Sequence, residues 1–319
     1  MDRYLITGFS GFVSKHFLEY LEGLQNQASV LGIDIAYPDF VLDRLNHVQC
    51  EFEKMDLLDR KGIEKIIFQF QPNYILHLAS YSSVAFSWAN PVKSFQNNTN
   101  ILLNVLEAVH SVHSGIRILS IGSSEEYGDL ADGHSIFNEE DALNPVSPYA
   151  VARVSQEMLS KLYAKDYGLD IVMTRSFNHI GPGQKETFVI ASFAKRLVEM
   201  KRGGASSPKL MTGDISLIRD FVDVRDVVRA YDGLLKKGRK GEIYNICRGV
   251  GYSLKELVQQ MVAILDMEVL TEIDAGLIRP NDNKVIIGSN EKIKCDTGWT
   301  PEIPLRQSLE DVINFWTHL

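Results

Sequence analysis

Short apolar runs alternate with segments of helical periodicity through the first half of the chain. The runs have the length of buried strands and occupy residues 3–7, 29–33, 48–52, 74–79 and 116–121. Between them, apolar residues recur three and four positions apart, most clearly in 62–70 and 91–112. Strands that alternate with helices predict a parallel sheet with helices on both faces, so we expect an α/β protein.

The first predicted strand leads into a turn with two glycines and then into a helix. The turn reads Gly8-Phe-Ser-Gly-Phe-Val-Ser14. Gly8 permits a tight turn, Gly11 lets a pyrophosphate approach the backbone, and the helix N-terminus offers N–H donors to it. Ser14 stands where a third glycine is usual, and its small side chain makes this a tolerated departure. The pattern predicts a Rossmann-type, doubly wound dinucleotide-binding fold.

Asp34 follows Gly11 by 23 residues, at the end of the second predicted strand. A carboxylate there accepts hydrogen bonds from the 2′-hydroxyl of an adenosine ribose and repels a 2′-phosphate. We therefore expect NAD(H), not NADP(H), as the cofactor. An Asp at a strand end is also a common turn former, and the preceding glycines favour the functional interpretation.

Ligands in such a sheet bind beyond the carboxyl ends of the strands. Polar and small residues stand at three of these ends: Asp56 after the third strand, residues 79–83 after the fourth, and Ser123-Ser-Glu-Glu-Tyr-Gly128 after the fifth. We expect them to face the site.

A tyrosine and a cation four residues apart start a later helical segment, Tyr149-Ala-Val-Ala-Arg153. This spacing puts both side chains on one face of a helix. A fixed positive charge near a phenol stabilises its phenolate, which makes the phenol a usable proton carrier. By itself the pair is also typical of an ordinary helix start with a solvated Arg.

Composition limits the other possibilities. The chain has 319 residues, 45% of them hydrophobic and 23% charged, which is enough for a large core. A formal net charge of −8 does not favour binding to nucleic acid or to an anionic membrane, which are themselves negatively charged. Cys50, Cys247 and Cys295 lack the spacing of a metal site or a disulfide framework, and no apolar run is long enough to cross a bilayer. We expect no metal and a cytoplasmic location.

Taken in order, these motifs resemble a known family. They are Gly-x-x-Gly, Asp34, Asn98, residues 123–128, Tyr149 to Arg153, Phe177-Asn-His-Ile-Gly-Pro-Gly183 and Arg219-Asp-Phe-Val-Asp-Val-Arg-Asp226. Together they are similar to the extended short-chain dehydrogenases/reductases that act on nucleoside-diphosphate sugars. Gly122 to Gly128, the loop that ends at Gln184, and the Arg279-Pro…Ile287-Gly-Ser289 tail most resemble GDP-4-keto-6-deoxy-mannose reductases, with GDP-mannose 4,6-dehydratases a near second.

The resemblance implies roles for particular residues. Tyr149 is the implied proton carrier to the sugar oxygen, Ser123 bonds the same oxygen, and Asn98 holds a proton-relay water. Arg153 stands where the family has Lys. A guanidinium keeps the charge but is bulkier and does not deprotonate, so we expect catalysis with an altered proton step.

Glu125 occupies the position of the general acid/base of the sugar 4,6-dehydratases. A dehydratase needs a carboxylate near C5 and C6, but reductases with the same Ser-Ser-Glu-Glu-Tyr pattern exist in the family. Asp34 favours a dehydratase, since enzymes that oxidise and re-reduce one sugar keep NAD, whereas the reductases commonly use NADPH. The two activities therefore stay open.

Binding positions are implied in the same way. For the cofactor they are Gly8, Ser10, Gly11, Phe12, Val13, Asp34, Ile35, Asp56, Leu57, Leu78, Ala79, Ser80, Ile121, Tyr149, Arg153 and Phe177; for the substrate they are Ser83, Glu125, Asn178, Val189, Arg219 and Arg279. Arginine suits a diphosphate because its paired N–H groups match phosphate oxygens.

We thus predict an NAD(H)-binding Rossmann domain in 1–176, with segments near 214–247 returning to it, and a smaller mixed α/β lobe for the nucleotide sugar mainly in 177–319. The expected activity is oxidoreduction at C4 of a nucleoside-diphosphate sugar, GDP-linked by resemblance. A 4,6-dehydratase, a C4 dehydrogenase, a 4-epimerase and a non-catalytic binding protein are the alternatives. Relatives commonly dimerise through helices near 91–112 and 149–167, which implies a homodimer.

Overall fold

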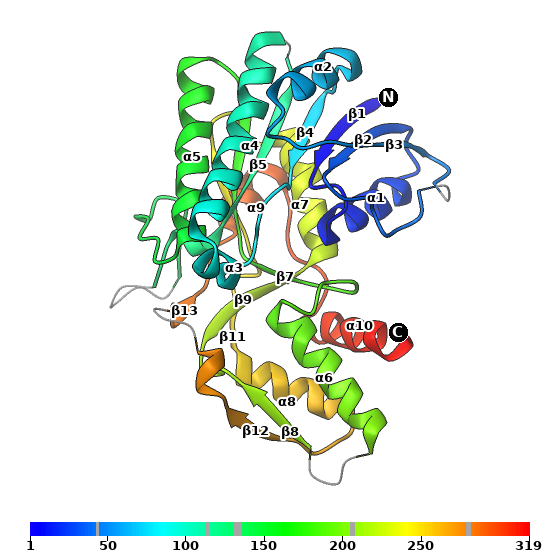
Figure 1. Ribbon diagram of the computed structural model, residues 1–319, viewed down its shortest axis with the longest axis vertical. Coiled ribbons are helices and arrows are strands. Elements are labelled where there is room, and N and C mark those ends of the chain that lie inside the picture. Colours follow the sequence, from blue (N-terminus) through cyan, green and yellow to red (C-terminus); the bar gives the residue numbers. More distant parts are fainter. Residues whose placement is uncertain (43–44, 113–114, 130–135, 205–207, 279–281) are drawn as a thin grey trace.

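The computed structural model describes residues 1–42, 45–112, 115–129, 136–204, 208–278 and 282–319. The chain forms a larger body around a central sheet and a smaller lobe, which lies below the sheet in Figure 1. Arg279 falls outside the described residues.

A seven-stranded parallel sheet organises the larger body, in the order β10-β6-β5-β4-β1-β2-β3. Its strands are β1 (Asp2–Thr7), β2 (Ala28–Asp34), β3 (Val48–Lys54), β4 (Tyr74–His77), β5 (Arg117–Ser123), β6 (Asp170–Ser176) and β10 (Ile243–Ile246). The chain winds outward from β1 to β2 and β3 on one side and to β4, β5 and β6 on the other. This reversal beside β1 is the switch point at which such sheets bind ligands.

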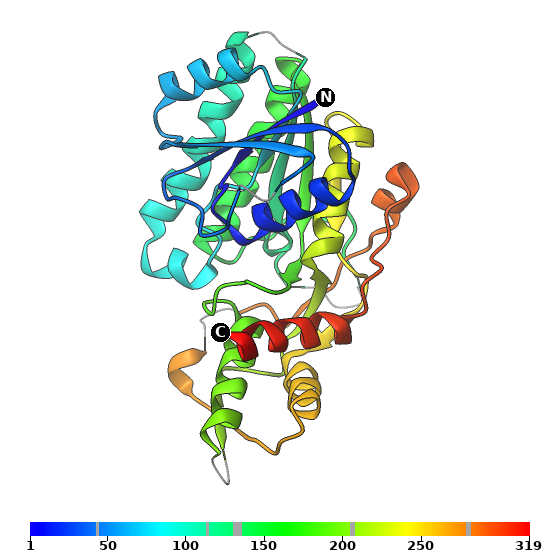
Figure 2. The ribbon, with the colours of Figure 1, turned by 90° about the vertical axis from the view of Figure 1, so that its right-hand side faces the viewer.

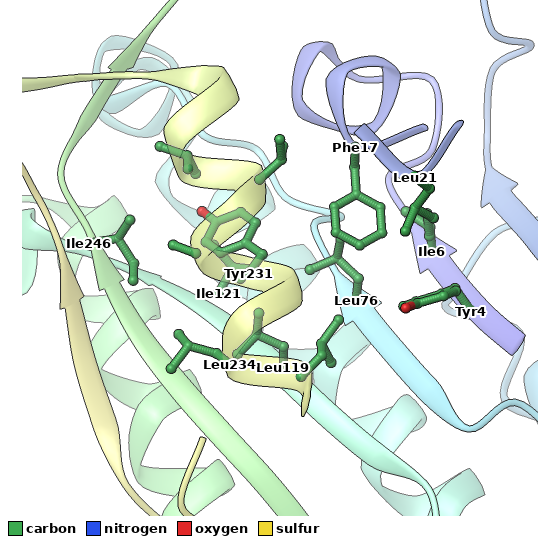
Figure 3. Close-up of a cluster of buried hydrophobic side chains, with 14 of the residues drawn as sticks. Tyr4, Ile6, Phe17, Leu21, Leu76, Leu119, Ile121, Tyr231, Leu234 and Ile246 are labelled. Carbon is green, nitrogen blue, oxygen red and sulfur yellow. The ribbon is translucent and has the colours of Figure 1, made fainter. Parts of the chain in front are cut away.

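Helices cover both faces of this sheet. One face carries α1 (Phe12–Gly23), α7 (Val224–Lys237) and α9 (Glu291–Thr297); the other carries α2 (Arg60–Phe70), α4 (Pro91–Val112) and α5 (Pro148–Asp166). Figure 3 shows Tyr4, Ile6, Leu76 and Leu119 of the strands against α1 and α7. Their strand neighbours Leu5, Ile75 and Ile118 are buried on the other face. Burial on both faces explains why these strands are continuous apolar runs.

The smaller lobe has a core of its own, formed by α6 (Val189–Gly203), α8 (Leu254–Ile264) and α10 (Leu305–His318). Figure 2 shows α10 lying between the sheet body and the rest of the lobe. A mixed sheet contains β7 (Asn178–Ile180), β9 (Ile218–Asp223), β11 (Gly251–Ser253) and β13 (Val285–Ile286), and β8 (Lys209–Thr212) pairs in parallel with β12 (Leu270–Ile273). Three short helices complete the elements: α3 (Val84–Ala89), η1 (Ser124–Glu126) and η2 (Ala275–Leu277).

Three elements that follow residue 177 belong to the sheet body, because β10 pairs with β6, α7 packs against α1, and α9 packs against α7 and β10. The predicted boundary between residues 176 and 177 stays a prediction. In the part of the chain that the structure describes, no helix has the length and apolar character needed to cross a membrane.

Candidate active site

The glycine turn lies between β1 and α1, at the switch point. Gly8 has a φ of +69°, and a Cβ there would lie 2.6 Å from Ala79 N, so only glycine fits. Gly11 precedes α1 in an extended conformation, without a side-chain cap on the helix. The N–H groups of the first helical turn, at Phe12 and Val13, are thereby left for an anion. The hydroxyl of buried Ser14 donates to Gly8 O at 3.1 Å, and this hydrogen bond stabilises the turn.

Asp34 is held at the mouth of this turn. Its Oδ2 accepts a hydrogen bond from Ser10 N at 2.9 Å and its Oδ1 accepts one from Ala36 N at 3.2 Å. The Ser10 hydroxyl donates to Ala36 O at 2.6 Å, which ties the turn to the segment after β2. Ile35 beside it is exposed. The carboxylate is therefore fixed where the second strand ends, next to the turn.

Two further segments border this end of the sheet. After β3, Asp56 Oδ1 accepts from Leu58 N at 2.9 Å, and the Leu57 side chain is buried. After β4, Leu78 N donates to Thr7 O at 3.1 Å and Ala79 N donates to Thr7 Oγ1 at 3.3 Å. The two bonds to Thr7 place the segment after β4 beside the carboxyl end of β1.

Asn98 of α4 is buried and fixes the loop after β4. Its Oδ1 accepts from Tyr81 N at 2.8 Å and its Nδ2 donates to Tyr81 O at 3.2 Å. Ser83 follows in that loop and caps α3 by accepting from Phe86 N. The structure thus gives Asn98 a role in shaping the loop, and the water-holding role that the resemblance implied stays a prediction.

Tyr149 and Arg153 lie in the first turns of α5 and form a direct contact. Ser147 caps this helix by accepting from Ala150 N at 3.1 Å, and Pro148 opens it. Arg153 Nε donates to Tyr149 OH at 3.2 Å. Both side chains are almost fully buried, with 6% and 4% of their surface exposed. The positive charge is therefore next to the phenol, as the spacing predicted.

Three more acceptors hold the guanidinium. Arg153 Nη1 donates to Ile121 O at 2.8 Å and to Gln156 Oε1 at 2.7 Å, and Nη2 donates to Ser80 Oγ at 2.6 Å. These partners come from α5 and from the ends of β4 and β5. Arg153 thus joins the two strand ends to the helix that carries Tyr149.

His77, which ends β4, is also buried near Arg153. Its Nδ1 lies 2.9 Å from Thr7 Oγ1. Burial, with a smaller effect from the positive charge of Arg153, lowers the pKa of His77 to about 3. The imidazole is therefore neutral at physiological pH and adds no charge to the site.

Ser123 ends β5 and starts η1. Its Oγ accepts from Glu125 N at 3.3 Å, and its own N–H donates to Glu126 Oε1 at 2.6 Å. The carboxylate of Glu125 receives a hydrogen bond at Oε2 from Asn283 Nδ2, at 3.2 Å. Asn283 is nearly fully buried and comes from the segment before β13, so the second half of the chain contacts the loop after β5 directly.

The expected diphosphate ligand Arg219 lies on β9 and is buried. Its Nη2 donates to Asn283 O and makes an ion pair with Asp282 at 3.1 Å. Asn178 begins β7 beside β9, and Val189 begins α6. Phe177 packs its ring in a small buried cluster with Tyr127, Phe137, Cys247 and Ile286. Among the described residues no group of His, Cys, Asp and Glu has the arrangement of a metal site.

Comparison with known proteins gives the family. The model of the family described as GDP-mannose 4,6 dehydratase matches residues 5–312. The chain belongs to this family. A GDP-6-deoxy-D-mannose reductase of Pseudomonas aeruginosa is 32% identical over 315 residues, which cover 99% of this chain and 97% of the relative. A dTDP-glucose 4,6-dehydratase of Haemophilus influenzae is 28% identical over 343 residues. This alignment covers 99% of this chain and 98% of that relative.

Solved structures agree in fold. RMD from Pseudomonas aeruginosa complexed with NADPH superposes with a TM-score of 0.87 and 31% identity, covering 100% of this chain and 99% of that one. The UDP-glucose 4-epimerase of Thermus thermophilus in complex with NAD gives a TM-score of 0.84 and 27% identity, with 98% of both chains covered. The predicted family, the Rossmann-type α/β fold and the prediction of an enzyme are confirmed.

In this member of the GDP-mannose 4,6-dehydratase family, a fully buried carboxyl lies under the Ser123 backbone. Glu126 Oε1 accepts the Ser123 N–H, while Oε2 is buried and has no hydrogen-bond partner among the described residues. Burial raises the pKa of Glu126, and the nearby Glu157 carboxylate raises it further. Glu126 therefore keeps its proton in the folded protein at pH values where the unfolded chain has released it.

Glu126→Gln is expected to make stability less sensitive to alkaline pH. Because the folded-state pKa of Glu126 lies above its ordinary value of 4.5, its contribution to stability is complete below about pH 4.5 and is lost as the pH rises through neutrality. Glutamine keeps an acceptor for Ser123 and does not titrate. In thermal unfolding, the Tm of the variant minus the Tm of wild type should therefore increase as the pH is raised from about 5 to about 8. A difference that stays constant over this range would contradict the prediction.

Two residues of this site were not predicted from the sequence. Gln156 and Asn283 belong to none of the motifs, yet the first contacts Arg153 and the second contacts Glu125. Gln156 stands three positions after Arg153 on the same helix, so the helical period alone would have placed it nearby. Asn283 reaches Glu125 from 158 positions along the chain, which only the folded structure shows.

Proposed function

We propose that the protein is an NAD(H)-dependent oxidoreductase acting at C4 of a nucleoside-diphosphate sugar, with reduction of a GDP-linked 4-keto-6-deoxy sugar as its leading activity. The observation that carries the proposal is the buried contact between Tyr149 and Arg153 beside the ends of β4 and β5. The 32% identity to the Pseudomonas aeruginosa GDP-6-deoxy-D-mannose reductase supports the GDP-linked substrate.

Reduction requires a hydride at C4 and a proton at the attached oxygen. A bound nicotinamide cofactor would supply the hydride. Tyr149 donates its phenolic proton to the oxygen, and Arg153 stabilises the phenolate that remains. The Ser123 hydroxyl donates a hydrogen bond to the same oxygen and so stabilises the negative charge that develops there.

The residues around the glycine turn suit such a cofactor. The turn of Gly8 and Gly11 and the uncapped start of α1 fit a pyrophosphate, and Asp34 fits the adenosine ribose. Arg153 Nη2 has a second N–H for which the described residues offer no acceptor, and it can donate to a ribose hydroxyl.

Asp34 is expected to favour NADH over NADPH, although the Pseudomonas aeruginosa RMD structure holds NADPH. The Asp34 carboxylate repels a 2′-phosphate, and Asp34→Ser should lower the ratio of kcat/KM for NADH to that for NADPH by about tenfold or more. A control variant can be made at Lys54, a charged residue that lies opposite Asp34 in the sheet. Lys54→Met should leave use of NADH unchanged. A wild-type preference for NADPH would overturn the assignment of Asp34.

Glu125 favours a second candidate, the 4,6-dehydratase. Glu125 stands two residues after Ser123 and its backbone N–H donates to Ser123 Oγ, while Asn283 holds its carboxylate, as a base or acid acting on C5 and C6 would need to be held. The relatives include both activities by name, GDP-6-deoxy-D-mannose reductase and dTDP-glucose 4,6-dehydratase. A C4 dehydrogenase or a 4-epimerase would share the hydride step with either.

One experiment separates these activities from each other and from simple binding. The purified protein is incubated with GDP-, UDP-, CDP- and dTDP-sugars and with their 4-keto-6-deoxy derivatives, while NADH absorbance and product mass are followed. A reductase consumes NADH only with the ketosugar, whereas a dehydratase gives a product lighter by one water without net loss of NADH. Turnover of none of these sugars would overturn the proposal.

We also propose a homodimer formed through α4 and α5. These helices pack against each other, and an open apolar groove of about 630 Å³ borders them, lined by Trp88, Val92, Phe95 and Val151 among others. Met158 and Leu162 continue the exposed apolar surface along α5. Sedimentation of wild type and Met158→Glu tests this, and a wild-type monomer would rule it out.

A further inference from the structure

The arginine at position 153 requires more acceptors than the lysine it replaces. A guanidinium has five N–H donors in a fixed plane, whereas an ammonium has three on a flexible stem. Buried in the site, Arg153 directs four of the five to Tyr149 OH, Ile121 O, Gln156 Oε1 and Ser80 Oγ. Two of these acceptors are side chains on the same face of α5: Tyr149 lies one turn before Arg153, and Gln156 lies about one turn after it.

Gln156 is itself fixed in one orientation. Its side chain is 1% exposed, and its Nε2 donates to Ser120 Oγ at 3.0 Å and to Ile121 O at 2.9 Å. Ile121 O can only accept and the Arg153 guanidinium can only donate, so the NH₂ group faces Ile121 O and the amide oxygen faces Arg153. Ser160 donates to Ser120 Oγ at 3.0 Å and completes the chain of bonds. The oxygen that meets the guanidinium is therefore held by β5 as well as by α5.

We propose that Gln156 is a positioning residue for the proton step: its amide oxygen fixes the Arg153 guanidinium against Tyr149 while leaving its positive charge unneutralised. The inference rests on the proposed function. A carboxylate at this position would also fix the arginine, but it would cancel the charge that stabilises the phenolate. A neutral acceptor such as the Gln156 amide orients the guanidinium and keeps its full effect on the phenol.

The other titratable groups around this pair do not supply the same effect. His77 of β4 is neutral, and buried Tyr231 of α7 has its pKa raised by burial and bonds Ser176. Burial and the Glu157 carboxylate raise the pKa of Glu126 of η1 to about 8, so Glu126 is neutral at neutral pH. Glu157 of α5 is paired with Arg175 of β6 and with Lys161. Among these described groups, Arg153 is the cation in direct contact with Tyr149, and Gln156 is one of the acceptors that hold it.

A double-mutant cycle tests the proposal. Gln156→Met keeps the size of the side chain, removes the acceptor, and is expected to lower kcat about tenfold with little change in KM for the cofactor. In an Arg153→Lys background the same change should have an effect at most about twofold, because the lysine has no Nη1 to hold. Equal effects in both backgrounds would overturn the proposal.

Gln156→Glu supplies a second readout. Its carboxylate should move the alkaline limb of the pH profile of reduction to higher pH by about one unit, since it disfavours the phenolate. Tyr163 lies on α5 away from Arg153, and its hydroxyl donates to Glu107 of α4, so Tyr163→Phe should move neither kcat nor the profile. An unmoved profile in Gln156→Glu would show that Gln156 is only structural.

The role of Gln156 can be tested without any substrate. The phenolate absorbance of wild type minus that of Tyr149→Phe follows the ionisation of Tyr149 without cofactor or sugar. In the Gln156→Glu background this difference curve should shift to higher pH whatever the substrate is. A shift without turnover of any sugar would overturn the function alone, and turnover without a shift would overturn the role of Gln156.

Discussion

Replacing Tyr149 by phenylalanine is expected to lower kcat by about 10²- to 10⁴-fold, the range in which a positioned general acid contributes. The ring stays, so the packing of the helix start is preserved, and only the proton donor and the acceptor for Arg153 Nε are lost. Binding of NADH should change little, because the cofactor contacts proposed at the glycine turn and at Asp34 are untouched. Steady-state rates with the ketosugar and a separate NADH titration measure the two effects.

Tyr163→Phe is the matched control for this variant. Tyr163 lies on the same helix, and its hydroxyl donates to the Glu107 carboxylate on α4, away from the site. Its loss should cost stability without lowering kcat. If Tyr149→Phe kept more than about a tenth of the wild-type rate, Tyr149 would not be the proton donor.

Replacing Arg153 by methionine is expected to lower kcat by about 10²-fold or more and to destabilise the fold as well. The positive charge beside the phenol disappears, so the phenolate left by proton transfer loses its stabilisation. Ile121 O, Gln156 Oε1 and Ser80 Oγ also lose their donor, and hydrogen bonds to charged groups are each worth about 1.5–3 kcal/mol. Rates combined with denaturant unfolding separate the two losses.

Arg153→Lys keeps the positive charge, and it serves as the control in case the methionine variant does not fold. It should remain active, with a rate far above that of the methionine variant, and its pH profile of hydride transfer should differ from that of wild type, because an ammonium is smaller and can itself release a proton. A profile that did not move would show that the exchange of lysine for arginine is neutral in this enzyme. A methionine variant as active as the lysine variant would exclude a role for the charge.

The site depends on contacts between distant parts of the chain. Asn283 contacts Glu125 through its side chain and Arg219 through its carbonyl, while Lys284 N and Val285 N donate to Asp129. This segment therefore links the loop after β5 to β9 of the smaller lobe. Glu125 and Arg219, both expected from the resemblance to bind the substrate, are thus held by one residue, Asn283.

Much of the sheet body could be predicted because its signals are local. The apolar runs, the glycine turn and the Tyr149 to Arg153 spacing each depend on residues a few positions apart, and each corresponds to an element with that geometry. Burial on both faces made the strands uniformly apolar, and the helical period placed the arginine one turn after the tyrosine. Gly8 had to be glycine because the chain passes so close to Ala79.

The amino-acid sequence by itself determined the fold class, the family, the glycine turn between β1 and α1, and the contact between Tyr149 and Arg153. Only the tertiary structure decided how that cation is held, through Gln156, Ile121 and Ser80, and how Asn283 reaches Glu125. The reason is physical: periodicity and turn chemistry act over one or two helical turns, whereas the partners of a buried charge are chosen by packing between elements far apart in the chain.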